Sequence, residues 1–468
     1  MVELKNEIIE TGEGLKNGQQ FCPNCGSTQA YYDPKIGKII CPICESKFEG
    51  TPFEQTDTRT LNKNMIGSGA KNINEEFNDL VTIKCNGCGA EIVFDTSKAT
   101  QKKCHWCGGI LSINERIENG TVPDVILPFI VTKEQAYEEM KKYLKDKRKY
   151  VRGTFKKNFK IENITGVYLP YMLIDANTRC YFEGEGEHQT AQYEHKLYGT
   201  IRYNSDVYKI KRIFDLEIED LTIEASIEKV NKNKKHTTNN IINSIMPFDT
   251  KNCIKFESSY LTNFTSEKRN INIDELNKKV ETEIKDIARH KLNKTILDYD
   301  RGIKWTKEKV NIKGMRWISA YLPVWIYSYY DKKKTHYVAV NGRTRETAGS
   351  TPMDRTKLFA VYGGLVIILI LIVIFLEKKY PGNSTAPVAA FMLMAFLIRY
   401  YKQTCTKYKN LEARHKYEKE TKTVLTMFLK EDEYIDNRKK QKNYEIKDKN
   451  NERTDGEDIE IEYKQKHK

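Results

Sequence analysis

Residues 358–376 read LFAVYGGLVIILILIVIFL, a run of nineteen residues with no charged residue and no proline. At a rise of about 1.5 Å per residue, a helix of this length matches the ~30 Å hydrocarbon core of a bilayer. A buried helix of a soluble protein normally keeps polar positions on one side, and this run has none. The run therefore predicts a transmembrane helix, with a fully buried soluble helix as the alternative.

A second apolar segment, 386–401, follows after a short polar stretch. Its apolar part is short for a membrane span, but Arg399 and Lys402 can extend it by reaching to the membrane surface. Basic residues flank the pair on both outer sides: Arg343, Arg345, Arg355, Lys357, Arg399, Lys402, Lys407 and Lys409. Because basic flanks favour the cytoplasmic side, we expect a transmembrane helical hairpin with cytoplasmic N- and C-termini. The alternative is one span with an external tail.

The N-terminal third carries two sets of cysteines in Cys-x-x-Cys pairs. The sets are Cys22, Cys25, Cys41 and Cys44, then Cys85, Cys88, Cys104 and Cys107. Fifteen residues separate the pairs within each set, and each cysteine of the second set follows its counterpart by 63 residues. This internal duplication suits tetrahedral Zn(II) bound by four thiolates. We therefore predict zinc ribbons at 18–49 and 81–113, two structural zinc ions, and a polar linker at 50–80.

Other uses of these cysteines are a rubredoxin-like iron site and a redox dithiol. Catalytic zinc is not expected, because four thiolates leave no open position for water. The three remaining cysteines of the eleven have no paired spacing. Metal-type cysteine usage, without a basic segment and apolar stretch at the start of the chain, favours a cytosolic N-terminal part over a secreted one.

The surface of the ribbons has two possible interpretations. Lysines and aromatic residues in and around them suit single-stranded nucleic acid: Lys35, Lys38, Lys84, Lys98, Lys102, Lys103, Tyr31, Tyr32 and Trp106. A net charge of +14 agrees with an anionic partner, whether nucleic acid or lipid. An ordinary solvated ribbon surface, free to contact a protein, is the interpretation that we favour.

Residues 122–350 predict an α+β region. Thr132 and Gln135 have the spacing of a capping box at the start of a helix. An apolar stripe at helical spacing predicts a second helix between Asn272 and Leu292. The motif Tyr-Leu-Pro occurs at 168–170 and 321–323, each time before a β-rich stretch, which indicates a duplicated strand-meander element. Asn341-Gly342 predicts a tight turn between two strands.

No catalytic constellation is visible. Acidic and histidine residues gather only at Glu183, Glu185, Glu187, His188, Glu194 and His195. Such a cluster can bind a divalent ion, but a solvated hairpin edge is the interpretation that we favour. The charged segment 402–468 is predicted to be a cytosolic tail whose last thirty residues are disordered.

In the order of its motifs the chain resembles the bacterial TFIIB-type zinc-ribbon-containing membrane proteins of Firmicutes. The matching pieces are the Cys22–Cys44 ribbon, Leu127-Pro-Phe129, Gly166-Val-Tyr-Leu-Pro170, Pro247-Phe-Asp249, Tyr321-Leu-Pro-Val-Trp325 and Val340-Asn-Gly-Arg-Thr344. The resemblance implies a membrane-tethered cytosolic region with no established activity, and a role in envelope stress. The Lys/Asn-rich spacer at 225–246 and the charged tail depart from that pattern.

Together these features predict a non-enzymatic, membrane-anchored scaffold that recruits a cytosolic protein partner to the inner membrane face. The alternative is a membrane-tethered nucleic-acid-binding protein that uses the ribbons.

Overall fold

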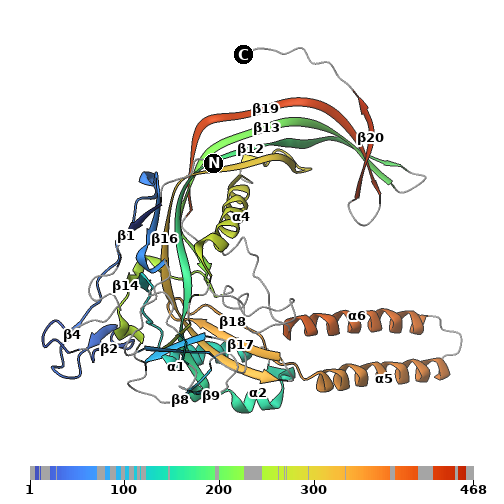
Figure 1. Cartoon of the computed structure of the whole chain (residues 1–468). Helices are drawn as coiled ribbons and strands as arrows, with labels where there is room; N and C mark the ends of the chain where they lie inside the picture. Colours follow the sequence, from blue (N-terminus) through green and yellow to red (C-terminus); the bar gives the residue numbers. More distant parts are fainter. Residues whose placement is uncertain are drawn as a thin grey trace.

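The computed structural model describes residues 6–9, 11, 22–27, 29–70, 80–84, 91–95, 101–104, 110–112, 116–117, 123–145, 148–195, 200–225, 245–261, 263–267, 269, 271–292, 295–331, 334–379, 385–408, 425–447 and 452–459. It is a multidomain α+β structure built on one large sheet, with a small cysteine-bearing unit at one side and a pair of long helices at the other (Figure 1).

Three long strands form the backbone of the large sheet: β12 (Ile164–His195), β13 (Thr200–Glu224) and β16 (Ile303–Asp331). The central strand β12 pairs antiparallel with both of the others. The sheet continues beyond β16 through β17 (Lys334–Asn341) and β18 (Thr347–Gly349), which are joined by the predicted Asn341-Gly342 turn. Two residues of the turn, Arg343 and Thr344, donate backbone N–H groups to Asn341 Oδ1.

The two Tyr-Leu-Pro motifs are direct neighbours. In the β12–β16 pairing, Tyr168 lies opposite Pro323, Leu169 opposite Leu322, and Pro170 opposite Tyr321. The motifs therefore meet around a local two-fold axis between Leu169 and Leu322.

The same two-fold axis relates two helices of the body. Helix α1 (Lys133–Lys145) and helix α4 (Ile273–Leu292) begin 140 residues apart. Their caps correspond, because Thr132 N–H donates to Gln135 and Asn272 N–H donates to Glu275, each at 3.1 Å. Strand β11 (Val125–Ile126), before α1, runs parallel to β16, and β15 (Thr265–Glu267), before α4, runs parallel to β12. The duplication therefore includes a strand and a helix before each long strand.

Alternation along β12 divides the core into two faces. Tyr168 and Met172 point to the face that carries α1 and α4, and Leu169 and Tyr171 point to the opposite face. Both helices lie on one face, as a two-fold axis perpendicular to the sheet requires. The stretch 245–253 covers part of the opposite face, through Ile245, Phe248 and Cys253. Strand β7 (Glu91–Asp95) extends the sheet beside β15, and its Ile92 packs in the same cluster.

The predicted linker at 50–80 is wrong for the part that the structure describes. Residues 58–70 form η1 (Thr58–Thr60), β5 (Asn64–Gly67) and η2 (Ser68–Ala70), and β5 pairs in parallel with β16 and with β1 (Asn6–Ile9). Parallel pairing uses main-chain groups, so a polar, Gly-rich segment can join the sheet.

Further short elements complete the body. They are β6 (Leu80–Lys84), β10 (Arg116–Ile117), β14 (Ile254–Lys255), α2 (Gly153–Asn158), η3 (Arg148–Tyr150), η4 (Ile161–Asn163), η5 (Thr250–Asn252) and η6 (Ser258–Leu261).

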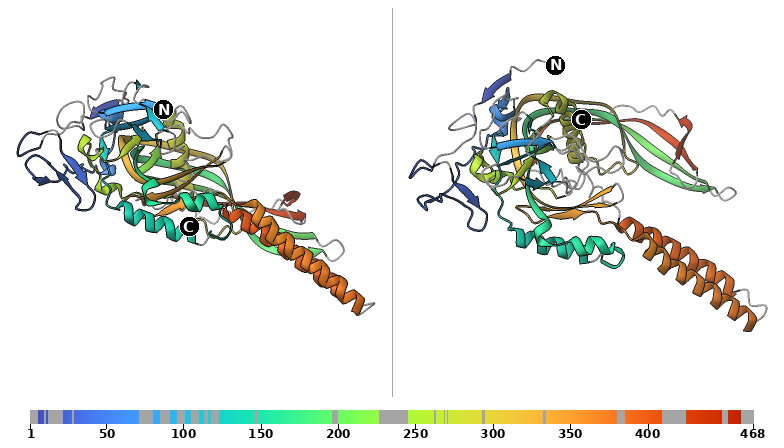
Figure 2. Two further views of the ribbon diagram at one scale, coloured as in Figure 1. Left: turned by 90° about the horizontal axis from the view of Figure 1, so that it is seen from below. Right: turned by 60° about the horizontal axis from the view of Figure 1, so that its bottom comes forward.

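Helices α5 (Arg355–Lys379) and α6 (Thr385–Tyr408) lie side by side and project from the body (Figures 1 and 2). At their base, Leu358 and Tyr362 are buried in the same core cluster as α1 and β17. Within the described residues one helix is long and apolar enough to cross a membrane, over Arg355–Phe375 with a mean hydropathy of 3.1. Only 11% of its most apolar window is buried inside the protein.

The tail differs from the prediction. Residues 425–447 form strand β19 (Leu425–Lys447), which pairs with β13, and β20 (Glu452–Ile459) pairs with β19. The edge of β13 offers backbone groups with which another strand can pair, and this main-chain pairing does not require an apolar segment. Composition alone therefore misjudged this part of the tail.

Candidate metal centre

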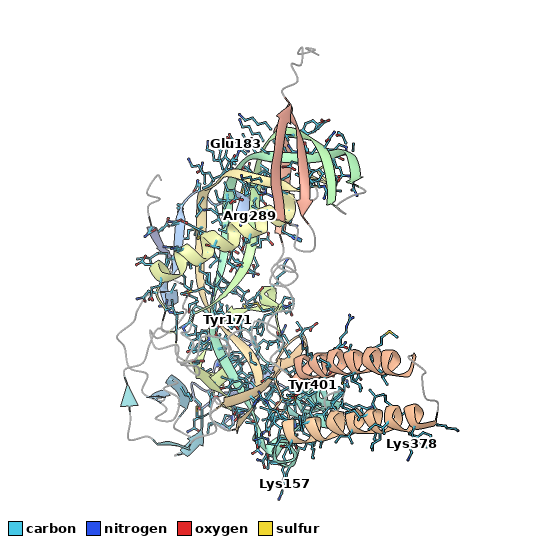
Figure 3. All side chains as sticks on the ribbon, turned by 90° about the vertical axis from the view of Figure 1, so that its right-hand side faces the viewer. Lys157, Tyr171, Glu183, Arg289, Lys378 and Tyr401 are labelled. Atoms are coloured by element: carbon cyan, nitrogen blue, oxygen red, sulfur yellow. The ribbon has the colours of Figure 1, made fainter. Side chains whose placement is uncertain are left out.

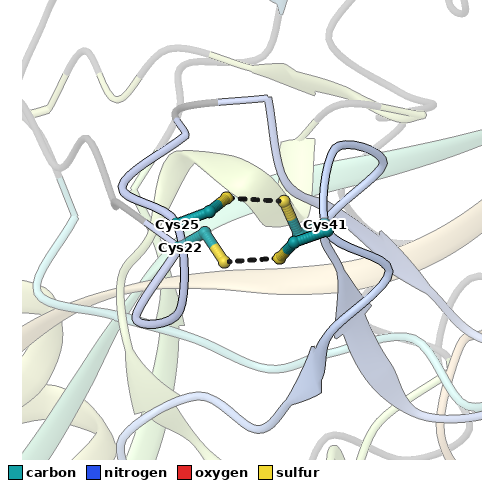
Figure 4. Close-up of side chains that lie close together, drawn as sticks. Cys22, Cys25 and Cys41 are labelled. Atoms are coloured by element: carbon teal, nitrogen blue, oxygen red, sulfur yellow. Dashed lines mark hydrogen bonds between the residues drawn. The ribbon is translucent and has the colours of Figure 1, made fainter.

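Four cysteines of the first set converge at one point (Figure 4). Cys22 Sγ lies 3.6 Å from Cys44 Sγ, and Cys25 Sγ lies 3.6 Å from Cys41 Sγ. All four sulfurs lie within 4.8 Å of one another. A disulfide would bring two sulfurs to about 2.05 Å, so these are four separate thiol groups.

Two similar backbone loops carry these sulfurs. Gly26 N–H donates to Cys22 O at 2.8 Å, and Glu45 N–H donates to Cys41 O at 2.9 Å. The residue after each pair has a positive φ, +70° at Gly26 and 59° at Glu45. A glycine at the first position was the expected signal for this turn, whereas the second loop makes it with a glutamate.

A short sheet holds the loops in place. It consists of β2 (Tyr31–Asp33), β3 (Lys38–Ile40) and β4 (Lys47–Phe48). This sheet and the two cysteine loops lie where the first ribbon was predicted, and we call the unit at residues 22–48 ribbon 1.

Hydrogen bonds favour the thiolate form of two of the cysteines. Ser46 Oγ lies 3.0 Å from Cys44 Sγ and 3.2 Å from Cys22 Sγ. The Ser46 hydroxyl is the largest influence that lowers the pKa of both thiols, to about 5 at Cys44. The pKa of Cys25 is raised to about 12: its hydrogen bond from the Ser27 backbone opposes the rise, while desolvation and the neighbouring sulfurs cause it.

The geometry fits a tetrahedral metal ion. Zn–S bonds of ~2.3 Å in a tetrahedron place the sulfurs about 3.8 Å apart, close to the two 3.6 Å separations found here. The Ser46 hydroxyl contacts two of the sulfurs, and hydrogen bonds of this kind stabilise thiolates that bind a metal. The group of four can therefore hold one metal ion, and with four sulfur ligands that ion has no position left for a substrate.

Ribbon 1 is fixed to the large body through Tyr32. This side chain is 2% exposed, and its hydroxyl donates to Phe129 O at 2.7 Å. Its ring lies 4.6 Å from the ring of Tyr260. Tyr32 is therefore unavailable as a stacking platform for nucleic-acid bases, as the alternative function required.

The second cysteine set is only partly described. Cys104 is 1% exposed and packs in the core cluster on the far face of the large sheet, whereas Cys85, Cys88, Cys107 and Trp106 lie outside the described residues. The duplication nevertheless extends to strand pairing. In ribbon 1, Ile39 pairs with Phe48; in β8 (Gln101–Lys103) and β9 (Ile110–Ser112), Lys102 pairs with Leu111, again 63 residues later.

The acidic and histidine cluster does not form a solvated edge along its first half. Glu183 lies on the central strand β12, opposite Lys211 on β13 and Lys307 on β16. Its carboxylate is 3.9 Å from Lys307 Nζ, at the end of the sheet away from the helical pair (Figure 3). His188 Nδ1 lies 2.9 Å from Asp298 O. The side chains of Glu194 and His195 are not among those that the structure describes. Cross-strand charge pairing accounts for Glu183 without a metal.

The sequence analysis did not predict a second group of contacts, which joins four of the sequence motifs around Gly342. Gly342 N–H donates to Pro323 O, and Gly342 O accepts from Val131 N–H, both at 2.9 Å. Arg343 donates to Asp249 at 2.8 Å and to Pro128 O at 3.4 Å. The Leu-Pro-Phe, Tyr-Leu-Pro, Pro-Phe-Asp and Asn-Gly-Arg motifs are therefore parts of one junction. Their order along the chain carries no signal of this contact.

The chain is similar to a bacterial protein over most of its length. It is 25% identical over 347 residues to the uncharacterized protein YdjG of Bacillus subtilis (strain 168), which covers 74% of this chain and 93% of that protein. No family model matches the chain, and no solved structure matches it. The similarity extends beyond a single ribbon, while membership of the TFIIB-type zinc-ribbon family stays a prediction.

Proposed function

We propose that this chain is a membrane-anchored zinc-ribbon scaffold that holds a cytosolic protein partner at the inner membrane face. One observation carries the proposal: ribbon 1 is attached to the body by a buried tyrosine and still exposes two large apolar side chains. Ile36 is 45% exposed and Ile43 is 64% exposed. Exposed apolar side chains on a rigidly held unit favour contact with another protein over contact with phosphates.

The zinc assignment rests on the donor set. Four thiolates in a tetrahedral arrangement favour zinc over harder ions such as Mg²⁺ or Ca²⁺. We propose one structural zinc ion in ribbon 1. A second ion, bound by Cys85, Cys88, Cys104 and Cys107, is supported by the repeated cysteine spacing and by the repeated β3–β4 pairing.

The anchor that we propose is the pair α5 and α6, crossing the membrane as two spans. The side chains of α5 support it, because Phe359 is 72% exposed and Leu371 and Phe375 are 60% and 64% exposed. Water would solvate this surface poorly, whereas lipid chains would cover it. The basic flanks of the pair support cytoplasmic termini.

The test compares partners captured after cross-linking in intact membranes. The full chain, an Ile36→Ser, Ile43→Ser variant and an Ile8→Ser control are expressed at equal levels. Ile8, on β1, is 45% exposed and lies outside ribbon 1. We expect the double variant to lose at least one protein that the other two chains capture, with unchanged zinc content.

Equal protein capture by all three chains would refute the use of this ribbon surface. If purified full-length chain in neutral detergent instead binds single-stranded nucleic acid with a steep dependence on salt, the nucleic-acid alternative replaces the scaffold.

A further inference from the structure

Helices α1 and α2 line a half-open pocket of about 500 Å³, and the segment between these helices contacts the base of α5. The volume lies within the ~300–1,000 Å³ typical of ligand sites. Its position follows from contacts of the same segment: Asp354 N–H, just before α5, donates to Tyr150 O at 2.7 Å. The ring of Tyr150 lies 6.5 Å from that of Tyr362 on α5.

Figure 3 shows the same relation at the level of side chains. Lys157 of α2 and Tyr401 of α6 lie at the same end of the helical pair, and Lys378 of α5 lies at the other end. Tyr401 packs against the core cluster that contains Phe155 of α2. If α5 spans the membrane, as proposed above, this pocket lies at the level where headgroups of the cytoplasmic leaflet begin.

The pocket has an apolar wall and a basic rim. Tyr137, Leu144 and Phe159 line the wall, and the rings of Tyr137 and Phe159 stack at 5.1 Å. The rim carries Lys141, Lys142, Lys145 and Lys156, and the carboxylate Glu138 also lines the pocket. An apolar wall beside several ammonium groups is complementary to a molecule with both a hydrocarbon chain and a negative headgroup.

Two of these lysines, Lys141 and Lys142, keep their ammonium groups accessible to such a ligand. Lys141 pairs with Glu138 and Lys142 with Glu139, at 3.2 Å and 2.8 Å, but their side chains remain 60% and 70% exposed. Exposed pairs of this kind contribute little and exchange readily for another anion. Residues 133–160 contain eleven Lys and Arg and four Asp and Glu, so this segment holds seven of the chain's fourteen net positive charges.

We propose that the α1–α2 pocket binds one anionic phospholipid of the cytoplasmic leaflet. Its phosphate contacts the lysines of the rim, and the upper part of one acyl chain contacts the aromatic wall. The proposal rests on the proposed membrane anchor, because only an anchored chain keeps this pocket at the leaflet surface. Its consequence is that the orientation of the sheet and of ribbon 1 on the membrane depends on the lipid.

The test uses the full-length chain in a neutral detergent. Phosphatidylglycerol and phosphatidylcholine with identical acyl chains are titrated separately, and the fraction of chains with one bound lipid is measured by native mass spectrometry. We expect phosphatidylglycerol to bind about tenfold more tightly than phosphatidylcholine. A Lys141→Gln, Lys142→Gln, Lys145→Gln variant loses most of that preference.

The matched control is Lys133→Gln, Lys157→Gln, Lys160→Gln, which removes equal charge from the same segment outside the pocket. It should keep its affinity for phosphatidylglycerol within about twofold. Equal losses in both variants, or no preference between the two lipids, overturn the proposal. Tighter binding of a poly-glutamate peptide than of phosphatidylglycerol also overturns it, in favour of an acidic protein segment.

A separate readout tests the membrane anchor. Wild-type chain that stays in membranes after alkaline extraction while showing no lipid preference refutes only the pocket. Release of the chain by that extraction refutes the proposed anchor.

Discussion

Asp124 is the residue on which several distant segments depend. Its side chain is 2% exposed and accepts hydrogen bonds from Gly69 N–H at 2.6 Å, from Ser319 N–H at 2.7 Å and from the Thr11 hydroxyl. Three segments that are distant in the sequence therefore meet at one carboxylate. A lone aspartate within the apolar run 122–131 was the available signal, but the sequence does not say which groups surround it.

This carboxylate should make stability depend on pH. Burial raises the pKa of Asp124 to about 6, against the hydrogen bonds that lower it. In the unfolded chain the pKa is about 3.9, so between these values the folded chain holds a proton that the unfolded chain has lost. The contribution of Asp124 to the free energy of unfolding is fully present below pH ~4. It is lost, by up to about 3 kcal/mol, as the pH rises through ~6.

Asp124→Asn is the variant that isolates this contribution. The variant is less stable throughout, because its amide nitrogen cannot accept from Ser319 N–H, but it lacks the titration. Melting temperatures of both full-length chains in neutral detergent, measured from pH 4 to 7, should therefore converge as the pH rises. Parallel curves would show that Asp124 titrates alike in both states.

Gly342 tests the motif junction. A Cβ at this position would lie 2.6 Å from a carbon of the Phe129 ring and 2.8 Å from Pro323 Cβ. Both neighbours are packed in the body, so we expect Gly342→Ala to destabilise the chain by about 1–3 kcal/mol. Gly153→Ala is the control, because a Cβ there meets nothing within 4 Å. Thermal unfolding should separate the two variants clearly; equal melting temperatures would contradict the close packing.

At the scale of elements, ribbon 1 is too small to hold together by its own core. Its buried side chains are few, and the site formed by four sulfurs joins both ends of the unit. Metal binding then supplies most of the folding free energy of such a unit. Removal of the metal by a chelator should make residues 22–48 sensitive to protease while the large sheet stays resistant. Mass mapping of the fragments checks this, and uniform digestion of the chain would contradict it.

The second cysteine set gives a separate prediction about stoichiometry. If both sets bind metal, the full chain contains two zinc ions. A Cys85→Ser, Cys88→Ser variant should then contain one, and Cys180→Ala, which changes a buried cysteine outside both sets, should still contain two. Metal analysis of the purified chains decides this. One ion per wild-type chain would remove the second site.

Local signals predicted the elements well. The capping box of α1 is confirmed, since Gln135 N–H donates to Thr132 Oγ1 at 3.3 Å and Thr132 N–H donates to Gln135 Oε1 at 3.1 Å. The helix expected at 272–292 is confirmed as α4. These features depend on neighbours three or four residues away, so the sequence displays them directly.

Pairings between distant segments were not predictable in the same way. The short stretch 64–67 carries no signal that it will pair with β16, and residues 425–447 carry no signal that they will pair with the edge of β13. The cysteine spacing predicted that four sulfurs of ribbon 1 come together, but the burial of Tyr32 depends on Phe129, 97 residues later. Such contacts are determined by the assembled sheet.

At the scale of the whole molecule, the two-fold relation organises the α+β body. The half that contains β11, α1, β12 and β13 repeats as β15, α4, β16 and β17, with Leu169 and Leu322 at the centre. The two halves then serve different purposes. The base of α5 joins the core beside α1, through Leu358 and Tyr362, whereas the α4 core holds the long strands.

The orientation of this assembly depends on whether both α5 and α6 cross the membrane. Two crossings return the chain to the cytosol after Tyr408, whereas one crossing leaves the tail outside. A fluorescent protein that matures only in the cytosol, fused after Tyr408, should fluoresce, and alkaline phosphatase at the same position should be inactive. Fusions after Lys379 should give the opposite pair of results, because that point lies between the helices.

Active phosphatase at both points would leave α5 as the single span. Strand β19 would then lie across the membrane from β13, which is incompatible with their pairing. The fusion experiment therefore tests the membrane topology and the place of the tail in the sheet together.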